Sequence, residues 1–180
     1  MVTPVLVSWS GGKDSSAAAL GLPLRIVGIP PAASDQDYEA RMEAALAVYS
    51  SRGISTVAFG APFLSDIKAY REAWLSRIGL RAIFPIWHED TWALADTFVA
   101  EGFAAVVTCI DSQVLFRPFA GRLFDQAFLR DLPPSVDRCG ENGEFHTFVF
   151  AGPLFQGTVE FVIGEIVQRE RWYFCDLVAT

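Results

Sequence analysis

The sequence predicts an α/β protein with a mainly parallel sheet and a β-rich C-terminal lobe. Up to about residue 115, short apolar runs alternate with amphipathic segments, which is typical of repeated βα units. Glycines close two of the amphipathic segments, as they do at the C-terminal ends of helices. The last residues instead alternate apolar and polar side chains, as antiparallel strands do. We therefore expect residues 1–115 to form an α/β core and residues 116–180 a C-terminal lobe, joined in one compact unit.

The βα units can be placed one after another along the first part of the chain. After an initial strand and a second strand, Ser34 can cap a helix, and Asp37 stands three residues on, where it completes a capping box. Apolar side chains at helical spacing then continue until Gly53 ends the helix. Ser65 is expected to cap the next helix. The expected strands are residues 5–9, 24–29, 55–59, 81–87 and 103–110, and the expected helices are residues 34–52, 65–78 and 91–100.

The pattern changes after residue 115. One more helix is expected at residues 121–132, and Pro133 and Pro134 end it. A polar, glycine-rich loop at residues 137–144 then leads into a strand at residues 145–150. Residues 158–178 alternate like two antiparallel strands, which completes the β-rich C-terminal lobe.

Composition and charge limit the classes of function. Apolar residues make up 52% of the 180 and charged residues 19%, so the chain can bury a core. The net charge of −7 disfavours nucleic acid as the main partner, because phosphate neutralisation by basic residues supplies most of that affinity. No run approaches the roughly 20 apolar residues of a membrane span, and the N-terminus lacks the basic start of a secretory signal. We expect a cytoplasmic protein without a membrane partner.

The cysteines indicate neither a disulfide framework nor a zinc site. Cys109, Cys139 and Cys175 are odd in number and widely spaced, and no CxxC pair occurs. Cys109 and Cys175 lie in apolar, strand-like runs and are expected to be buried as small hydrophobic residues.

The strongest motif follows the first strand. Residues 10–15 read Ser10, Gly11, Gly12, Lys13, Asp14 and Ser15 and are followed by a helix start. Two glycines allow the backbone to approach an anion closely, and the N–H groups of a helix N-terminus favour negative charge. Serine hydroxyls and the Lys13 ammonium add donors, while Asp14 is expected to hold Mg²⁺ or to cap the helix. This pattern predicts a phosphate-binding loop that differs from the GxxxxGK[ST] loop of P-loop NTPases.

This loop resembles that of the PP-loop ATPases, whose SGGxDS motif binds the pyrophosphate end of ATP. The resemblance implies a HUP-type, Rossmann-like fold, in which helices lie on both faces of a mainly parallel sheet. It also implies that ATP is cleaved between its α- and β-phosphates. AMP is then transferred to a carboxylate or carbonyl oxygen, so that a nitrogen or sulfur nucleophile can displace it. Stabilisation of the departing pyrophosphate by the loop would be the main catalytic contribution.

A second polar cluster lies before the strand at residues 145–150. Residues 139–149 read CGENGEFHTFV, which places two carboxylates, an amide, an imidazole and a hydroxyl within a few residues. On a strand, Glu144, His146 and Phe148 would share one face, so Glu144 and His146 would lie side by side. Such a pair can handle protons or bind a cationic group. The alternative is an edge loop with solvated charges.

This cluster and other segments resemble the diphthine–ammonia ligase family. The similar segments are GENGEFHTF with AGPLF after it, FLSDIKAYRE, FPIW, and Gly121-Arg122 with Asp125. The resemblance covers nearly the whole chain and implies adenylation of a carboxylate, release of pyrophosphate, and attack by ammonia to give an amide and AMP. In that family the acceptor is diphthine, a modified histidine of translation elongation factor 2. By this resemblance, Lys13, Asp14, Glu144 and His146 act in catalysis. The acceptor side is lined by Glu141, Asn142, Glu144, His146 and Thr147.

Three features depart from the family pattern. Leu20 joins Gly21 directly, where relatives continue the helix and add a further strand and helix. A parallel crossover needs at least about a dozen residues, so this connection is short. Ala61 stands where an acidic residue is common, and His88 stands where glycine is common. Loss of the strand–helix unit would remove part of the adenine-binding wall and lower the affinity for ATP.

Two alternatives to an amide-forming ligase stay open. One is a degenerate ATP-binding or interaction module without turnover, for which the short connection argues. The other is a tRNA-modifying PP-loop enzyme such as a thiolase, against which the acidic charge and the lack of paired cysteines argue. The sequence leaves the acceptor and the oligomeric state open.

Overall fold

The computed structural model describes residues 5–7, 20–30, 32–60 and 62–180, which form two compact units. The first unit takes in residues 5–7 and Leu24–Glu89, and the second takes in residues 20–23 and Asp90–Thr180. The phosphate-loop motif at residues 10–15 lies outside the described residues. The α/β class is confirmed, because one unit contains a parallel sheet with helices and the other an antiparallel sheet.

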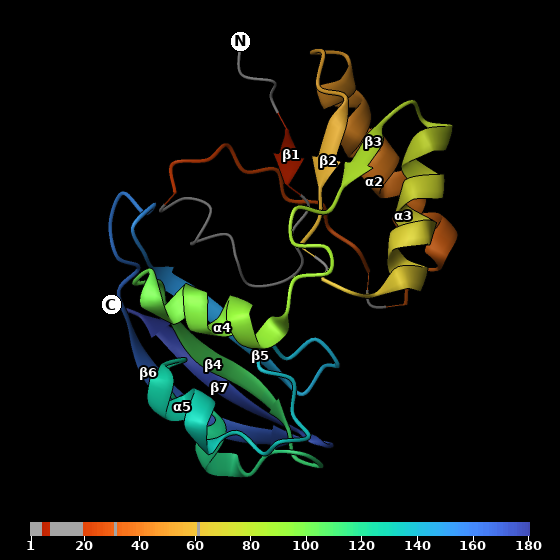
Figure 1. The fold of residues 1–180 in the computed structure, drawn as a ribbon. Coiled ribbons are helices and arrows are strands. Elements are labelled where there is room, and N and C mark those ends of the chain that lie inside the picture. The colour runs from red at the N-terminus through yellow and green to blue at the C-terminus, as the bar shows by residue number, and fades with distance from the viewer. Residues whose placement is uncertain (1–4, 8–19, 31, 61) are drawn as a thin grey trace. The chain divides into compact units, whose positions relative to one another are not determined.

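The first unit is a three-stranded parallel sheet with two helices (Figure 1). Its strands follow one another in sequence order, so right-handed crossovers place both helices on the same face. The sequence predicts helices on both faces of this sheet. Within the described residues, the first unit has helices on one face. The elements are β1 (Leu6–Val7), α2 (Asp35–Ser50), β2 (Thr56–Ala58), α3 (Ser65–Arg77) and β3 (Arg81–Ile83). The buried core contains Leu46, Val57, Phe59, Trp74, Leu75 and Leu80.

The helix α2 begins where the sequence predicts. The Ser34 hydroxyl accepts a hydrogen bond from the Asp37 amide at 3.1 Å, and the Asp37 carboxylate accepts from the Ser34 amide at 3.1 Å. This is the predicted capping box. The prediction for α3 was wrong by one residue. Leu64 occupies the N-cap position without a side-chain hydrogen bond, and Ser65 is the first helical residue.

The strand predicted at residues 24–29 is absent from the structure. These residues form neither helix nor strand, and Leu24, Ile26 and Ile29 are exposed. Pro23 and Pro30 bracket the segment, and a proline cannot donate to a sheet ladder. An apolar run is therefore a weak indication of a strand when prolines flank it.

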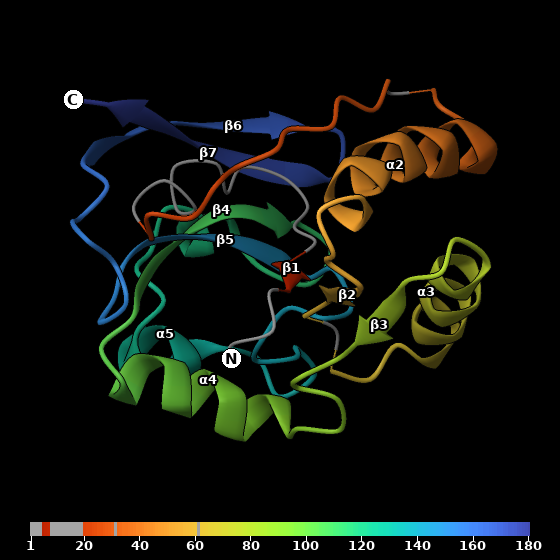
Figure 2. The ribbon, with the colours of Figure 1, turned by 90° about the horizontal axis from the view of Figure 1, so that it is seen from above.

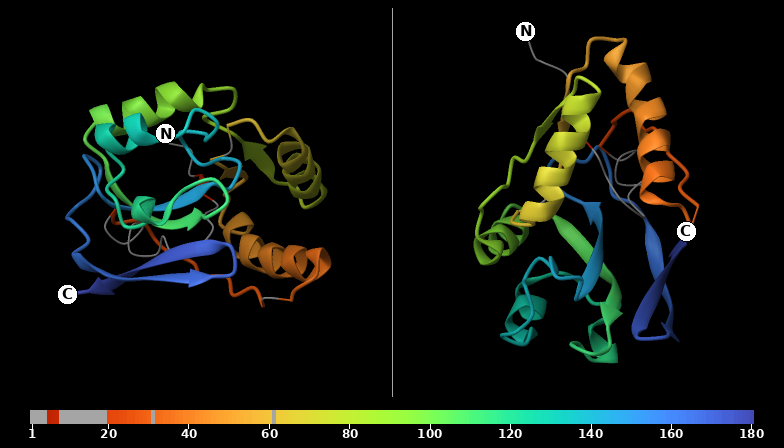
Figure 3. Two further views of the ribbon diagram at one scale, coloured as in Figure 1. Left: turned by 90° about the horizontal axis from the view of Figure 1, so that it is seen from below. Right: turned by 90° about the vertical axis from the view of Figure 1, so that its right-hand side faces the viewer.

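The second unit is a four-stranded antiparallel sheet in the order β5-β4-β7-β6, seen from above in Figure 2. Two helices and one 3₁₀ turn pack with it, and the helices cover one face (Figure 3). The elements are α4 (Thr91–Ala100), β4 (Ala104–Asp111), the turn Arg117–Phe119, α5 (Gln126–Asp131), β5 (Phe145–Ala151), β6 (Phe161–Arg169) and β7 (Trp172–Ala179). The core between helices and sheet includes Ala95, Val107, Ile110, Phe128, Leu129 and Phe145.

The structure divides the chain at Glu89–Asp90 and not near residue 115. The boundary was predicted too late in the chain because the apolar run of β4 resembles a buried strand of a parallel sheet. In the structure β4 pairs antiparallel with β5 and with β7. It is buried because helices cover one side and further strands flank both edges. The α4–β4 segment therefore belongs to the C-terminal unit.

The helix predicted at residues 121–132 is shorter than expected. Only Gln126–Asp131 is helical, and the Asp125 carboxylate caps it by accepting from the Phe128 amide at 2.8 Å. Residues 121–124 run along β4 instead, where the Gly121 amide donates to the Val107 carbonyl at 2.8 Å. Residues 105–107 of β4 pair with β5 at one edge and have no partner in β7 at the other, so their backbone groups can pair with residues 121–124. This pairing outweighs the helical pattern of residues 121–124.

The predicted burial of Cys109 and Cys175 is confirmed. All three thiols are free, and Cys109 and Cys175 are buried in the sheet. Among the described helices, none has the length and apolar character needed to cross a membrane.

Replacing Ser34 by alanine tests the cap of α2. We expect Ser34→Ala to lower the free energy of unfolding by about 1 kcal/mol, because it removes the acceptor for the Asp37 amide. Urea unfolding followed by circular dichroism measures this change. Ser76→Ala, at an exposed position on α3, is the control and should leave stability unchanged. Equal stabilities of the two variants would contradict the capping box.

Candidate functional site

The Glu144 carboxylate organises the loop at residues 137–144, which we call the signature loop. Glu144 is buried, with 7% of its surface exposed. One carboxylate oxygen accepts from the Asp137 amide at 2.9 Å and from the Asn142 side-chain amide at 3.0 Å. The other oxygen accepts from the Asn142 backbone amide at 3.0 Å. A single side chain therefore closes the loop from its first residue to its last.

The Asp137 carboxylate also holds the loop in place, from its first residue. One of its oxygens accepts from the amides of Cys139 at 2.9 Å and Glu141 at 3.2 Å. The other accepts from the Thr91 hydroxyl at 2.6 Å, at the first residue of α4. The backbone amides of residues 137 and 139–143 are thus all bonded within the loop. The loop therefore offers side chains to a ligand, and its amides are already used.

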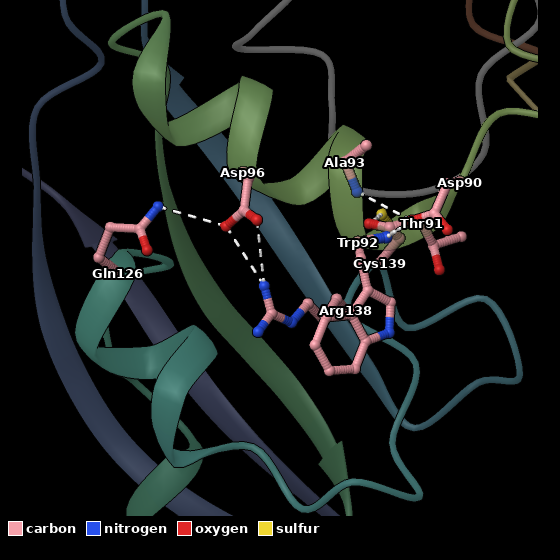
Figure 4. A network of polar contacts seen from close by, with 8 residues as sticks. All are labelled: Asp90, Thr91, Trp92, Ala93, Asp96, Gln126, Arg138 and Cys139. Carbon is pink, nitrogen blue, oxygen red and sulfur yellow. Dashed lines mark hydrogen bonds and ion pairs between the residues drawn. The ribbon is translucent and has the colours of Figure 1, made fainter.

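The signature loop is also fastened to α4 by side chains. Figure 4 shows Arg138 reaching between α4 and the loop, with its guanidinium 3.3 Å from both oxygens of Asp96. The same guanidinium lies 3.8 Å from the Trp92 ring centroid. The Cys139 thiol donates to the Thr91 carbonyl at 3.3 Å. The Asp90 carboxylate caps α4 by accepting from the Trp92 and Ala93 amides, which fixes the helix end that the loop contacts.

The end of β4 connects the loop to the sheet. The Asp111 amide donates to the Glu144 carbonyl at 2.9 Å, and the buried Asp111 carboxylate accepts from the Gln113 amide at 3.0 Å. Arg171, at the turn between β6 and β7, pairs with Asp111 at 3.5 Å. The loop is therefore held by α4 on one side and by β4 on the other.

The predicted site residues take three different environments. Glu144 precedes β5 and is buried, whereas His146 is exposed on β5, with its ring 6.4 Å from that of Trp172. The structure thus places these two side chains in different surroundings and does not pair them as the strand pattern suggested. Asn142 is exposed, and Glu141 and Thr147 are half-buried. Among the predicted site residues that the structure describes, Asn142 and His146 are the exposed ones.

The sequence of this unit matches a known family. A family model described as "Diphthamide synthase C-terminal domain" matches residues 90–179. The chain belongs to this family. Among curated proteins it is similar to "Diphthine--ammonia ligase" of Schizosaccharomyces pombe, with 24% identity over 128 residues. That alignment covers 69% of the chain and 21% of the relative, so the chain spans about a fifth of the relative's length.

The diphthamide synthase C-terminal domain corresponds to the part of the second structural unit that begins at Asp90. The family match begins at residue 90, where α4 is capped, and ends at residue 179, the last residue of β7. The signature loop lies inside this domain.

Several residues that shape the loop were missed by reasoning from the sequence. Asp137, Thr91, Arg138 and Asp111 were not assigned, although Asp137 stands two residues before Cys139, the spacing at which an aspartate bonds a following amide. The described residues hold no cluster of three histidine, cysteine or acidic side chains arranged for a metal. The predicted Mg²⁺ ligand, Asp14, lies outside them.

The Cys139 thiol is unsuited to nucleophilic chemistry. Burial, and then the nearby charges of Asp137 and Glu141, raise the pKa of Cys139 to about 12. Burial also raises the pKa of Cys109 and Cys175 above the ordinary value. Because the thiolate is the reactive form, all three thiols are expected to be inert near neutral pH.

Replacing Glu144 by glutamine tests its place in the loop. Glu144→Gln replaces one acceptor oxygen by the NH₂ group of a side-chain amide, a donor that would face the N–H donors of the loop. We expect it to lower the free energy of unfolding by about 1–3 kcal/mol. Urea unfolding measures the change. Glu165→Gln, exposed on β6, is the matched control and should stay within experimental error of the parent. A stable Glu144→Gln variant would show that the loop does not depend on this carboxylate.

Thiol labelling tests the cysteine environments. With a disulfide reagent at pH 8, the native protein should label at least about tenfold more slowly than protein unfolded in guanidinium, because raised pKa values reduce the thiolate fraction. The unfolded sample should label at all three cysteines and is the control. Native labelling as fast as unfolded labelling would contradict the assignment.

Proposed function

We propose that the chain is an ATP-dependent acid–ammonia ligase of the diphthine–ammonia type. The observation that carries the proposal is the family match over residues 90–179, which includes the closed signature loop. In the reaction, a carboxylate oxygen of the acceptor attacks the α-phosphorus of ATP and pyrophosphate leaves. Ammonia then attacks the acyl carbon, AMP leaves, and the nitrogen loses a proton as the amide forms. Diphthine on an elongation factor is the proposed acceptor.

The residues divide into a phosphate side and an acceptor side. Ser10, Gly11, Gly12, Lys13, Asp14 and Ser15 are proposed to bind the phosphates, with Asp14 as the Mg²⁺ ligand. Support for this comes from β1, a strand of a parallel sheet that ends at Val7, three positions before Ser10, because ligands of such sheets bind beyond the carboxyl ends of the strands. A HUP-type arrangement is part of this proposal. Bound Mg-ATP would supply the adenylyl group that activates the acceptor carboxylate.

The acceptor side is proposed to be the surface formed by the signature loop and the start of β5. Asn142 and His146 are exposed there and can hydrogen-bond to an acceptor or to ammonia. A neutral His146 imidazole can take the proton that ammonia loses on becoming an amide. Glu144 would keep these groups in place through the loop, and Glu141 and Thr147 border the same surface.

A degenerate ATP-binding module is the second candidate. Residues 20–30 contain no helix or strand, and the parallel sheet of the described residues has three strands. This fits the loss of a strand–helix unit near the adenine site. Such a module would bind a nucleotide weakly and release no AMP.

An amidation assay separates the two candidates. The chain is incubated with Mg-ATP, ammonium and an elongation factor that carries diphthine, and AMP, pyrophosphate and the acceptor mass are measured. We expect AMP in step with conversion of the carboxylate to the amide. Lys13→Ala should lower the rate by about 10²-fold or more, since it removes a cation from the departing pyrophosphate. Arg52→Ala, exposed near the end of α2, is the charge-matched control.

The outcomes distinguish the proposals. Binding of Mg-ATP by calorimetry without AMP release would favour the degenerate module. Absence of both binding and turnover in folded protein would overturn both.

A further inference from the structure

The carboxyl ends of the three parallel strands lie at one edge of the first unit's sheet. Ala58 of β2 pairs with β1 and with Ile83 of β3, so the next residues, Phe59 and Phe84, leave the sheet at that edge. In sheets of this kind, ligands bind in the space beyond these ends. The side chains gathered at this edge therefore bear directly on what the unit binds.

Three aromatic rings form a platform at this edge. The Phe59 and Phe84 rings stack with centroids 5.5 Å apart, and the Trp87 ring meets Phe84 edge-on at 5.8 Å. The loop that carries Trp87 is fixed by the His88 amide, which donates to the Pro62 carbonyl at 2.7 Å. His88 has a φ of 66°, a left-handed backbone that costs a side-chain-bearing residue energy and that glycine adopts freely. The platform is thus held in place at a conformational cost.

Two cationic side chains from α3 lie over the platform. The Lys68 ammonium is 4.4 Å from the Trp87 ring centroid and 5.7 Å from that of Phe84. The Arg71 guanidinium carbon is 4.2 Å from the Phe59 ring centroid. Lys68 and Arg71 are three residues apart and so share one face of the helix. Both positive charges are therefore positioned at the carboxyl edge of the sheet.

These charges are only partly compensated. A ring face attracts a cation but carries no formal charge, so it leaves the positive charge available to an anion. Lys68 meets Glu72 at 3.9 Å, the outer limit of an ion pair. Within the described residues, the Arg71 guanidinium has no carboxylate partner. In a chain of net charge −7, two such cations at a ligand-binding edge indicate an anionic ligand.

We propose that Lys68 and Arg71 form a phosphate-binding pair for the polyphosphate of the nucleotide. The ammonium supplies a point charge, and the guanidinium supplies a planar set of donors that matches phosphate oxygens. The aromatic platform holds both heads before the ligand arrives, so less side-chain freedom is lost on binding. Because the ligand is the nucleotide of the proposed reaction, this inference rests on the proposed function.

Calorimetry with Mg-ATP and with inorganic pyrophosphate tests the pair. Lys68→Met and Arg71→Met keep an apolar stem on the rings and remove the charge. Each is expected to weaken binding of both ligands about tenfold or more, as loss of a charged hydrogen bond does. Arg52→Met is the control, because its guanidinium also lies over a ring, that of Tyr49 at 5.9 Å, but at the end of α2. Lys68→Arg and Arg71→Lys keep the positive charge and should bind both ligands more tightly than the methionine variants do.

The outcomes separate this inference from the proposed function. Thermal melting confirms that each variant is folded before its binding is compared. If the parent binds and Lys13→Ala weakens binding while both methionine variants bind normally, the phosphate-binding pair is overturned and the proposed function stands. If the folded parent binds neither ligand, both are overturned. A loss of affinity in Arg52→Met equal to that in Arg71→Met would also overturn the pair, because it would reflect net charge alone.

Discussion

The buried carboxylate of Glu144 is the constraint on which the candidate site of the C-terminal unit depends. A buried carboxylate is costly unless hydrogen-bond donors surround it, and here three donors from one short loop do so. Its own backbone carbonyl accepts from Asp111 at the end of β4. The buried charge of Glu144 is thus stabilised by the closed loop, and the loop is in turn joined to β4 by the Glu144 backbone. Asp137 repeats this arrangement and extends it to the first residue of α4 through Thr91.

This architecture separates the side chains that hold the signature loop from those that stay accessible to a ligand. Glu144 and Asp137 accept hydrogen bonds from the loop's own amides, and Asp137 also accepts one from the Thr91 hydroxyl, whereas His146 and Asn142 stay accessible. A rigid loop can present such groups with little loss of freedom when an acceptor binds. On our proposals, the first unit recognises phosphate at the edge of its parallel sheet, and the signature loop of the second unit recognises the acceptor.

Local patterns predicted the elements whose causes are local. The capping box of α2 and the bounds of α4 follow from nearby side chains, and both are confirmed. The β4 strand was found, but its sheet was misassigned, because burial by helices and by neighbouring strands leaves the same apolar run. Residues 121–124 left their helical pattern to pair with β4. Such long-range pairing has no signature within the segment itself.

The same distinction applies to the candidate site. Residue types and the family resemblance located the loop, but the role of Glu144 depends on partners that only the fold brings into reach. Thr91 and Asp137 are separated by 46 positions and meet through one hydrogen bond. His88, where the resemblance led us to expect glycine, takes a left-handed backbone, which glycine adopts freely.

Native-state hydrogen exchange of the Cys139, Glu141 and Asn142 amides tests the central claim most directly. These amides donate to the carboxylates of Asp137 and Glu144, so each should exchange on the order of 10³-fold more slowly than in an unstructured peptide. Protection of all three, lost together in Glu144→Gln, is the predicted result. Exchange at the rate of a free peptide in the folded parent protein would show that the two carboxylates do not hold the loop.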